Sequence, residues 1–186
     1  MTALLWLAGA ILLAELSPDR RARGAAVLLA CVAGTTLPDL DLSLGLVHRS
    51  ILTHGPLLPA LLLLVPRWRA AAAGLALGVG LHLAADTFPN AMTGYATVKL
   101  PFAGSIGRTA SYLWLGINAL LATVAGAALL ARDFPPRWML GLLGGSAAIG
   151  VAYLFVTDGG WPALAVYAAF GWLAVRNRKQ GLPSRN

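Results

Sequence analysis

The residues of this chain that are best suited to chemistry gather within residues 37–86. All three histidines of the protein lie there, together with three of its seven acidic residues. The six are Asp39, Asp41, His48, His54, His82 and Asp86. Imidazole and carboxylate groups, with no thiolate among them, suit Zn²⁺, Mn²⁺ or Fe²⁺. The pattern predicts a divalent metal site, zinc first, that holds one ion or two ions sharing a carboxylate.

The spacing of these residues favours a shared site. His82 and Asp86 are four apart on an expected helix, so they lie on one face about one turn from each other. Asp39 and Asp41 flank Leu40, and their side chains point the same way if the chain is extended there. A simpler explanation exists for each residue alone, such as a hydrogen-bonded core histidine. This simpler explanation is harder to apply to all six residues together. Inserting an ionised aspartate at membrane depth costs about 2.5–3.5 kcal/mol, so such a residue usually has a partner.

Positive side chains near this cluster suggest further roles. Arg49 is either a clamp for a substrate phosphate or carboxylate, or the salt-bridge partner of Asp39 or Asp41. In a hydrolase, His48 would be a further ligand or the general acid–base, Asp41 a catalytic ligand, and Arg49 the group that holds substrate charge. Two other cations allow the same substrate-binding interpretation, with a structural one favoured: Lys99 and Arg108.

Apolar helices must position these side chains. The 186 residues are 58% apolar and 11% charged, with a mean hydropathy of +0.73, whereas soluble domains carry about 25% charged residues. A membrane span needs roughly 20 apolar residues. We predict an all-α, polytopic integral membrane bundle of about seven (six to seven) transmembrane helices, a single domain over residues 1–186. The expected spans are Thr2–Leu16, Gly24–Leu37, Gly55–Val65, Ala70–Phe88, Ala110–Ala131, Trp138–Val156 and Trp161–Val175.

The basic residues predict the orientation in the membrane. Eleven of the fourteen Lys and Arg residues fall in alternate connections, the last being the basic tail 176–186. By the positive-inside rule the N-terminus is outside and the C-terminus is cytoplasmic, in the bacterial plasma (inner) membrane. The same layout puts the predicted metal site of segment 37–109 at the outer leaflet, where residues 87–109 form a lid or lie on the headgroups. Because the positive charges are dispersed, the net charge of +7 does not predict nucleic-acid binding.

Three short motifs in this order resemble the YdjM-like family of membrane-bound metal-dependent hydrolases. They read Pro38-Asp39-Leu40-Asp41, His48-Arg49 followed by Thr53-His54, and His82-Leu83-Ala84-Ala85-Asp86. The resemblance covers about a third of the chain, and it departs from the family at Gly55, where many members have serine. The family is distantly similar to zinc-dependent phospholipase C enzymes and nucleases, which implies phosphoester substrates.

These observations together predict a membrane-embedded metal-dependent hydrolase. Its expected substrate is a phosphoester in a lipid or lipid-linked molecule at the outer face of the plasma membrane, and its expected partners are membrane lipids. The alternative is a non-catalytic membrane protein, either a metal or proton transporter or a scaffold with a structural metal or polar cluster. Transport is disfavoured, because the ionisable groups gather on one side rather than near the midplane.

Overall fold

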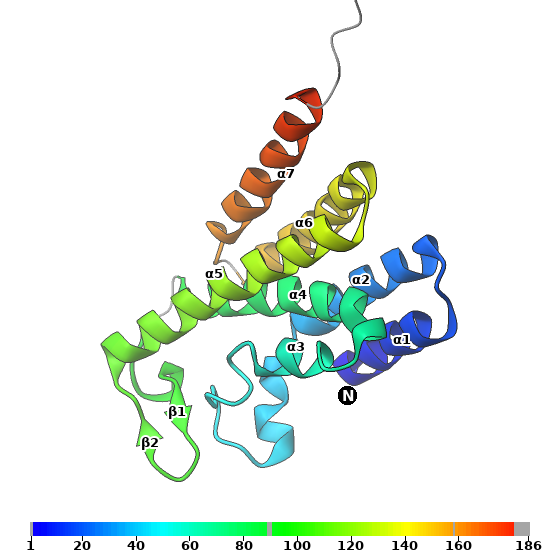
Figure 1. The fold of residues 1–186 in the computed structure, drawn as a ribbon. Helices are drawn as coiled ribbons and strands as arrows, with labels where there is room; N and C mark the ends of the chain where they lie inside the picture. The colour runs from blue at the N-terminus through cyan, green and yellow to red at the C-terminus, as the bar shows by residue number, and fades with distance from the viewer. Residues whose placement is uncertain (1, 89–90, 158, 181–186) are drawn as a thin grey trace, which may run out of the picture.

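The fold is built from helices joined by short connections (Figure 1). A computed structural model describes residues 2–88, 91–157 and 159–180 of the chain. Its α-helices are α1 (Thr2–Leu16), α2 (Arg20–Gly34), α3 (Leu57–Leu62), α4 (Arg69–Thr87), α5 (Arg108–Asp133), α6 (Pro136–Thr157) and α7 (Ala163–Gln180). Short 3₁₀ helices are η1 (Pro38–Leu44), η2 (Pro66–Trp68) and η3 (Gly94–Ala96). Strands β1 (Lys99–Leu100) and β2 (Gly104–Ser105) pair antiparallel as a small hairpin. The predicted all-α class fits this mostly helical structure.

Fewer helices are long enough to cross a membrane than the seven predicted. Among the described residues, three are long and apolar enough: Pro66–Thr87, α5 and α6. A fourth arises if α2 and η1 are counted as one span that is bent by 60°. The predicted third span, Gly55–Val65, contains only the six residues of α3, far short of the roughly 20 that a crossing needs. Seven transmembrane helices are therefore not confirmed, and residues 181–186 of the predicted basic tail lie outside the described residues.

Helix α4 lies at the centre of the bundle, between α2 and α5 (Figure 1). Nearly its whole length is buried. Small residues allow its backbone to approach both neighbours, as is common between membrane helices. A Cβ atom at Gly74 would lie 1.9 Å from the carbonyl oxygen of Val27 in α2, and one at Gly78 would lie 2.1 Å from that of Cys31. This close contact fixes the register of α4 against the end of α2, where the site described below begins.

Replacing Gly74 by alanine is expected to destabilise the bundle. The added Cβ would overlap a backbone carbonyl of α2, so the two helices must separate, and overpacking of this kind costs about 1–3 kcal/mol or more. Gly141→Ala in α6 is the matched control, because a Cβ there meets no atom within 4 Å. Unfolding in detergent, followed by circular dichroism, measures both variants. An equal change in the two unfolding free energies would contradict this account of the α2–α4 contact.

Two loop segments form a cap at one end of the bundle (Figure 1). The first leaves α2 through η1, which Pro38 opens and which ends at Gly45, a residue in the left-handed region with φ 70°. The second carries η3 and the hairpin. The two segments join where Ile51 N donates to Lys99 O at 2.9 Å and Lys99 N donates to Arg49 O at 3.0 Å. Within the predicted lid, residues 87–109, the segment around Lys99 is therefore bound to the segment that carries two of the histidines.

Candidate metal centre

Two histidines and two aspartates converge beneath this cap. The Nε2 atoms of His54 and His82 are 3.3 Å apart. Asp86 Oδ2 lies 3.3 Å from Nε2 of His54 and 3.4 Å from Nε2 of His82. Asp39 Oδ1 lies 3.7 Å from His82 Nε2. Asp39, His54 and His82 thus lie close enough together to bind one metal ion.

Different elements supply these four side chains. His82 and Asp86 are one turn apart near the end of α4, as their spacing predicts. Asp39 belongs to η1 and His54 lies just before α3. His82 and Asp86 share one face of α4 because of helical geometry alone. Asp39 and His54 reach the site only because η1 and the following loop fold over the end of α4.

The proton on His82 can be assigned from its partners. Nδ1 lies 2.9 Å from the carbonyl oxygen of Thr35, which can only accept a hydrogen bond. Nδ1 therefore carries the hydrogen, and a neutral ring has its lone pair on Nε2. Thr35 is the C-cap of α2, and carbonyls at a helix C-terminus have no partner within their own helix. The end of α2 thus selects the tautomer of His82.

A similar argument applies to His54. Its Nδ1 lies 3.1 Å from Thr53 Oγ1, and that hydroxyl donates its own hydrogen to the carbonyl of Ser50 at 3.2 Å. Thr53 Oγ1 is therefore the acceptor for His54 Nδ1–H. The lone pair of His54 is then also on Nε2, which faces His82. Two imidazole lone pairs and two carboxylate oxygens in this arrangement repel one another unless a metal ion or a proton lies among them.

Exposure differs across the cluster. His54 is fully buried and His82 nearly so, while 54% of the Asp39 side chain is exposed. The cluster is therefore most open to solvent on the Asp39 side, whereas the Asp86 side chain is 16% exposed. Such an opening distinguishes a metal site that can admit a water or substrate from a closed structural one.

The expectation that Asp39 and Asp41 face one site is wrong. Pro38 begins a 3₁₀ helix rather than an extended segment, and residues two apart in a 3₁₀ helix point in different directions. Asp41 is fully buried, where Oδ1 accepts from Leu42 N at 2.7 Å and Oδ2 from Ser50 N at 3.4 Å. Its Oδ2 lies 3.6 Å from His54 Nδ1. Asp41 thus supports His54 from the side opposite the four converging atoms.

His48 lies beside the cluster rather than in it. Its ring stacks on Tyr95 with centroids 4.0 Å apart and planes 11° apart, and its centroid is 6.3 Å from that of His54. Partial burial lowers the pKa of His48 below its ordinary value of 6.5. The ring is therefore neutral at pH 7 and able to accept a proton. Of the six predicted ligands, the structure brings four together and places Asp41 and His48 around them.

Arg49 is held by the cap and by Asp86. It has a φ of 56° and is only 6% exposed. Its Nη2 lies 2.7 Å from Asp86 Oδ1, and Nη1 donates to the carbonyl of Ala96. The salt bridge expected for Arg49 is therefore present, but with Asp86 in place of Asp39 or Asp41. Because the bond to Asp86 uses Oδ1, the other carboxylate oxygen is the one that faces the histidines.

The two other predicted substrate-binding cations lie elsewhere. Lys99 Nζ donates to the backbone carbonyls of His48 at 3.1 Å, Tyr95 at 2.8 Å and Thr97 at 2.8 Å. This pattern ties the two segments of the cap together, which agrees with the structural interpretation. Arg108 is exposed at the first residue of α5. A substrate-binding role for either residue stays a prediction.

Several residues that shape the site carry little sequence signal. Thr35 acts through its backbone carbonyl, which any residue type supplies. The hydroxyl of Tyr153, in α6, lies 3.0 Å from His82 Nδ1 although it is 71 residues away in the chain. Trp114 Nε1 donates to the carbonyl of His54 at 2.6 Å, and a Cβ at Gly55 would lie 3.3 Å from the Trp114 ring. The indole therefore occupies space that a larger residue at position 55 would need.

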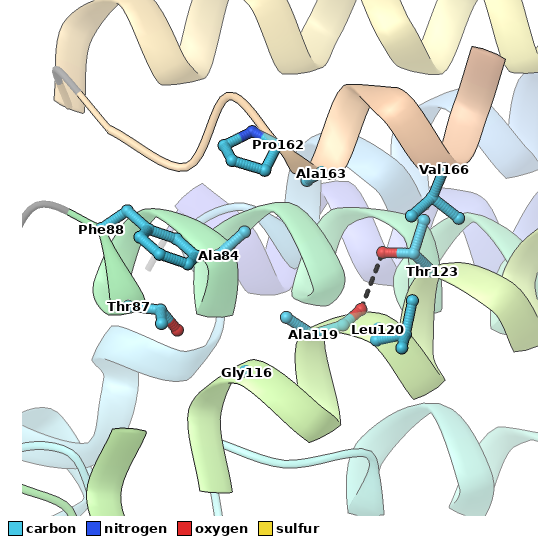
Figure 2. A pocket seen from close by; sticks show the side chains of 10 residues that line it. All are labelled: Ala84, Thr87, Phe88, Gly116, Ala119, Leu120, Thr123, Pro162, Ala163 and Val166. Atoms are coloured by element: carbon cyan, nitrogen blue, oxygen red, sulfur yellow. Dashed lines mark hydrogen bonds between the residues drawn. The ribbon is translucent and has the colours of Figure 1, made fainter. Parts of the chain in front are cut away.

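An apolar cavity on another face of α4 is separate from this cluster. It has a volume of about 150 Å³ and lies between α4, α5 and the start of α7 (Figure 2). Ala84 lines it from α4, and this residue is two positions from both His82 and Asp86, hence on roughly the opposite side of the helix; Phe88, which follows α4, also lines it. None of the described residues that line it is ionisable. The cavity does not contribute ligands to the metal centre.

No protein-family model, curated protein or solved structure matches this chain. The resemblance to the YdjM-like family rests on three short motifs alone. Conclusions about function must therefore follow from the donor atoms of the cluster, from their protons and from their exposure.

Proposed function

We propose that this protein is a membrane-bound hydrolase that uses one zinc ion to cleave a phosphoester of a lipid or lipid-linked substrate. The zinc ligands are Nε2 of His54, Nε2 of His82 and an oxygen of Asp39, which leaves the fourth position for a water, and Asp86 lies beside both imidazoles. The observation that carries the proposal is that Asp39, His54 and His82 lie close enough together to bind one ion, with Asp86 Oδ2 3.3 Å and 3.4 Å from the two Nε2 atoms. The proposed membrane is the bacterial plasma membrane, with the site at its outer face.

The separations and the donor types favour zinc. Ligand atoms about 2.0–2.1 Å from a tetrahedral Zn²⁺ lie roughly 3.3–3.4 Å from one another, close to the 3.3 Å between the two Nε2 atoms and the 3.7 Å between His82 Nε2 and Asp39 Oδ1. Mixed nitrogen and oxygen ligation is within the range of zinc, whereas Mg²⁺, Ca²⁺ and Mn²⁺ favour sites that are richer in oxygen. The convergence on one point supports one ion rather than two, because Asp41 and His48 lie outside the group.

Each remaining polar residue of the site has a part in this proposal. A zinc ion supplies Lewis acidity and lowers the pKa of a bound water to about 7. Thr35, Thr53 and Asp41 hold the two imidazoles, and Arg49 holds Asp86 in its ionised form. His48 is neutral at pH 7 and lies close to His54, so it is placed to take up the proton that water releases. Positioned acid–base groups of this kind typically contribute about 10²–10⁴-fold to the rate.

The surroundings of the cluster favour a lipid substrate. Tyr95, whose ring stacks on His48 beside the cluster, is well exposed, and Phe88 and Phe102 are exposed elsewhere on the surface. Aromatic residues at such positions are typical of the membrane–water interface. A site that opens beside Tyr95 meets lipid headgroups, and the phosphate of a headgroup suits a cationic centre. The motif resemblance implies the same substrate class.

The proposal is tested by metal content and lipid hydrolysis. We expect full-length protein purified in detergent without added metal to contain about one equivalent of zinc. It should release phosphate or a phosphoalcohol from phospholipids in mixed micelles, lose this activity with a chelator and regain it with Zn²⁺. His48→Gln should keep its zinc while its turnover falls about 100-fold. His48 is a suitable choice because it is not among the proposed zinc ligands.

The outcomes separate the hydrolase from its alternative. Bound zinc with no hydrolysis of any phosphoester lipid would support a structural metal in a non-catalytic protein. Zn²⁺ or proton flux into liposomes without hydrolysis would support transport. Metal-free protein that neither binds Zn²⁺ nor responds to the His82→Ala substitution would mean that the cluster is a polar packing network, and the hydrolase proposal would be abandoned.

A further inference from the structure

The hydroxyl of Tyr153 connects α6 to the histidine on α4. Its oxygen lies 3.0 Å from His82 Nδ1, on the side of the ring opposite the converging Nε2 atom. The two rings are 6.2 Å apart between centroids, with planes 26° apart. Tyr153 lies far outside the segment that carries the histidines and aspartates. Its contact with the cluster is therefore a product of the fold.

The direction of this hydrogen bond follows from the second partner of Nδ1. Thr35 O is 2.9 Å from the same nitrogen and can only accept. If Tyr153 donated to Nδ1, that nitrogen would carry a lone pair facing the carbonyl oxygen, which is repulsive. Nδ1–H is therefore shared between two acceptors, the Thr35 carbonyl and the Tyr153 hydroxyl. Acceptors from α2 and α6 then restrict rotation of the ring about its Cβ–Cγ bond.

We propose that Tyr153 is a positioning residue for the metal centre, which holds His82 in the Nδ1–H tautomer and aims Nε2 at the ion. This inference rests on the metal centre of the proposed function, whose ligands it leaves unchanged. An oxygen that accepts from the distal N–H of a metal-binding histidine fixes the orientation of the ring and raises its basicity, and removal of such a partner typically costs about 10–100-fold in metal affinity.

Tyr153 is the part of this arrangement that mutation can test. The Thr35 carbonyl belongs to the backbone and persists in every substitution. Tyr153→Phe removes only the hydroxyl and retains the ring between α6 and α4, so the variant is expected to fold. Tyr167→Phe is a matched control, because the Tyr167 hydroxyl donates to the carbonyl of Leu77 in the same helix α4 at 3.2 Å but does not touch His82.

The experiment measures Zn²⁺ affinity of the metal-stripped full chain in detergent, by competition with a chromophoric chelator. The visible absorption of the Co²⁺-loaded protein and the unfolding midpoint of the metal-free protein are recorded beside it. We expect Tyr153→Phe to bind Zn²⁺ at least about 10-fold more weakly and to show an altered Co²⁺ spectrum. Tyr167→Phe should bind both metals as the wild type does, even where its unfolding midpoint falls by a similar amount.

Each other outcome is decisive. Zn²⁺ affinity and a Co²⁺ spectrum unchanged in Tyr153→Phe would overturn the positioning role and leave the metal centre standing. An equal loss of affinity in Tyr167→Phe would show that general loosening of α4 is the cause, and would also overturn it. Wild-type protein that binds neither metal would overturn the metal centre itself, and the role of Tyr153 with it.

Discussion

His82→Ala is expected to remove metal binding from the protein almost completely. The substitution deletes the Nε2 atom that lies 3.3–3.7 Å from His54 Nε2, Asp39 Oδ1 and Asp86 Oδ2. Loss of a partner that merely orients a ligand already costs about 10–100-fold in metal affinity, so loss of a ligand should cost more than about 100-fold. Elemental analysis of protein purified without added metal measures the effect, together with Zn²⁺ titration of the stripped protein.

His48→Ala is the matched control for this result. It removes a histidine from the same region, but one whose ring stacks on Tyr95 and is not among the proposed ligands. We expect it to retain zinc at the wild-type level. Zinc lost equally in both variants would contradict the ligand set, and would return His48 to the role of ligand that the sequence also allows. Full zinc occupancy in His82→Ala would contradict the metal centre as described.

Arg49→Ala is expected to lower the free energy of unfolding of the metal-free protein by about 3–5 kcal/mol, the usual effect of removing one partner from a buried ion pair. The Arg49 guanidinium and the Asp86 carboxylate are only 7% and 16% exposed. The same guanidinium binds the carbonyl of Ala96, so its loss also releases the second segment of the cap. Chemical unfolding in detergent measures the stability, and limited proteolysis within residues 91–105 measures release of the cap.

Arg67→Ala provides the comparison for an exposed pair. Arg67 bonds Glu15, but their side chains are 63% and 36% exposed, and such pairs contribute roughly 0–1 kcal/mol. We expect little change in stability and no change in cleavage of the cap. If the two arginine variants lost equal stability, burial would not be what gives the Arg49–Asp86 pair its strength.

Hydropathy predicted the long helices well, because an apolar run of sufficient length has few other stable arrangements. Ala70–Phe88, Ala110–Ala131 and Trp138–Val156 were predicted, and α4, α5 and α6 begin and end within two residues of those limits. The run Gly55–Val65 has a similar composition but forms only a short helix. Pro56 and Pro59 lie within it, and proline lacks the N–H that a helix interior requires. A hydropathy average over a window does not detect the effect of these two prolines on helix length.

The local geometry of the cluster was predictable only where a regular element sets it. His82 and Asp86 share a face because an α-helix repeats every 3.6 residues, and their contact of 3.4 Å confirms it. No such rule governs the segment after Pro38. The alternation expected of an extended chain failed there, because η1 turns Asp41 into the interior and leaves Asp39 partly in solvent.

The sequence by itself determined which groups are available, namely three imidazoles and three carboxylates in one apolar chain. It also placed two of these groups, His82 and Asp86, on one helical face. Only the tertiary structure decided which four converge, and which nitrogen of each ring carries the lone pair. For His82 the choice of nitrogen depends on acceptors distant in the chain, 47 residues away at Thr35 and 71 at Tyr153. One of them is a backbone carbonyl, which every residue has. A residue type cannot reveal such a partner, because its position depends on where α2 ends against α4.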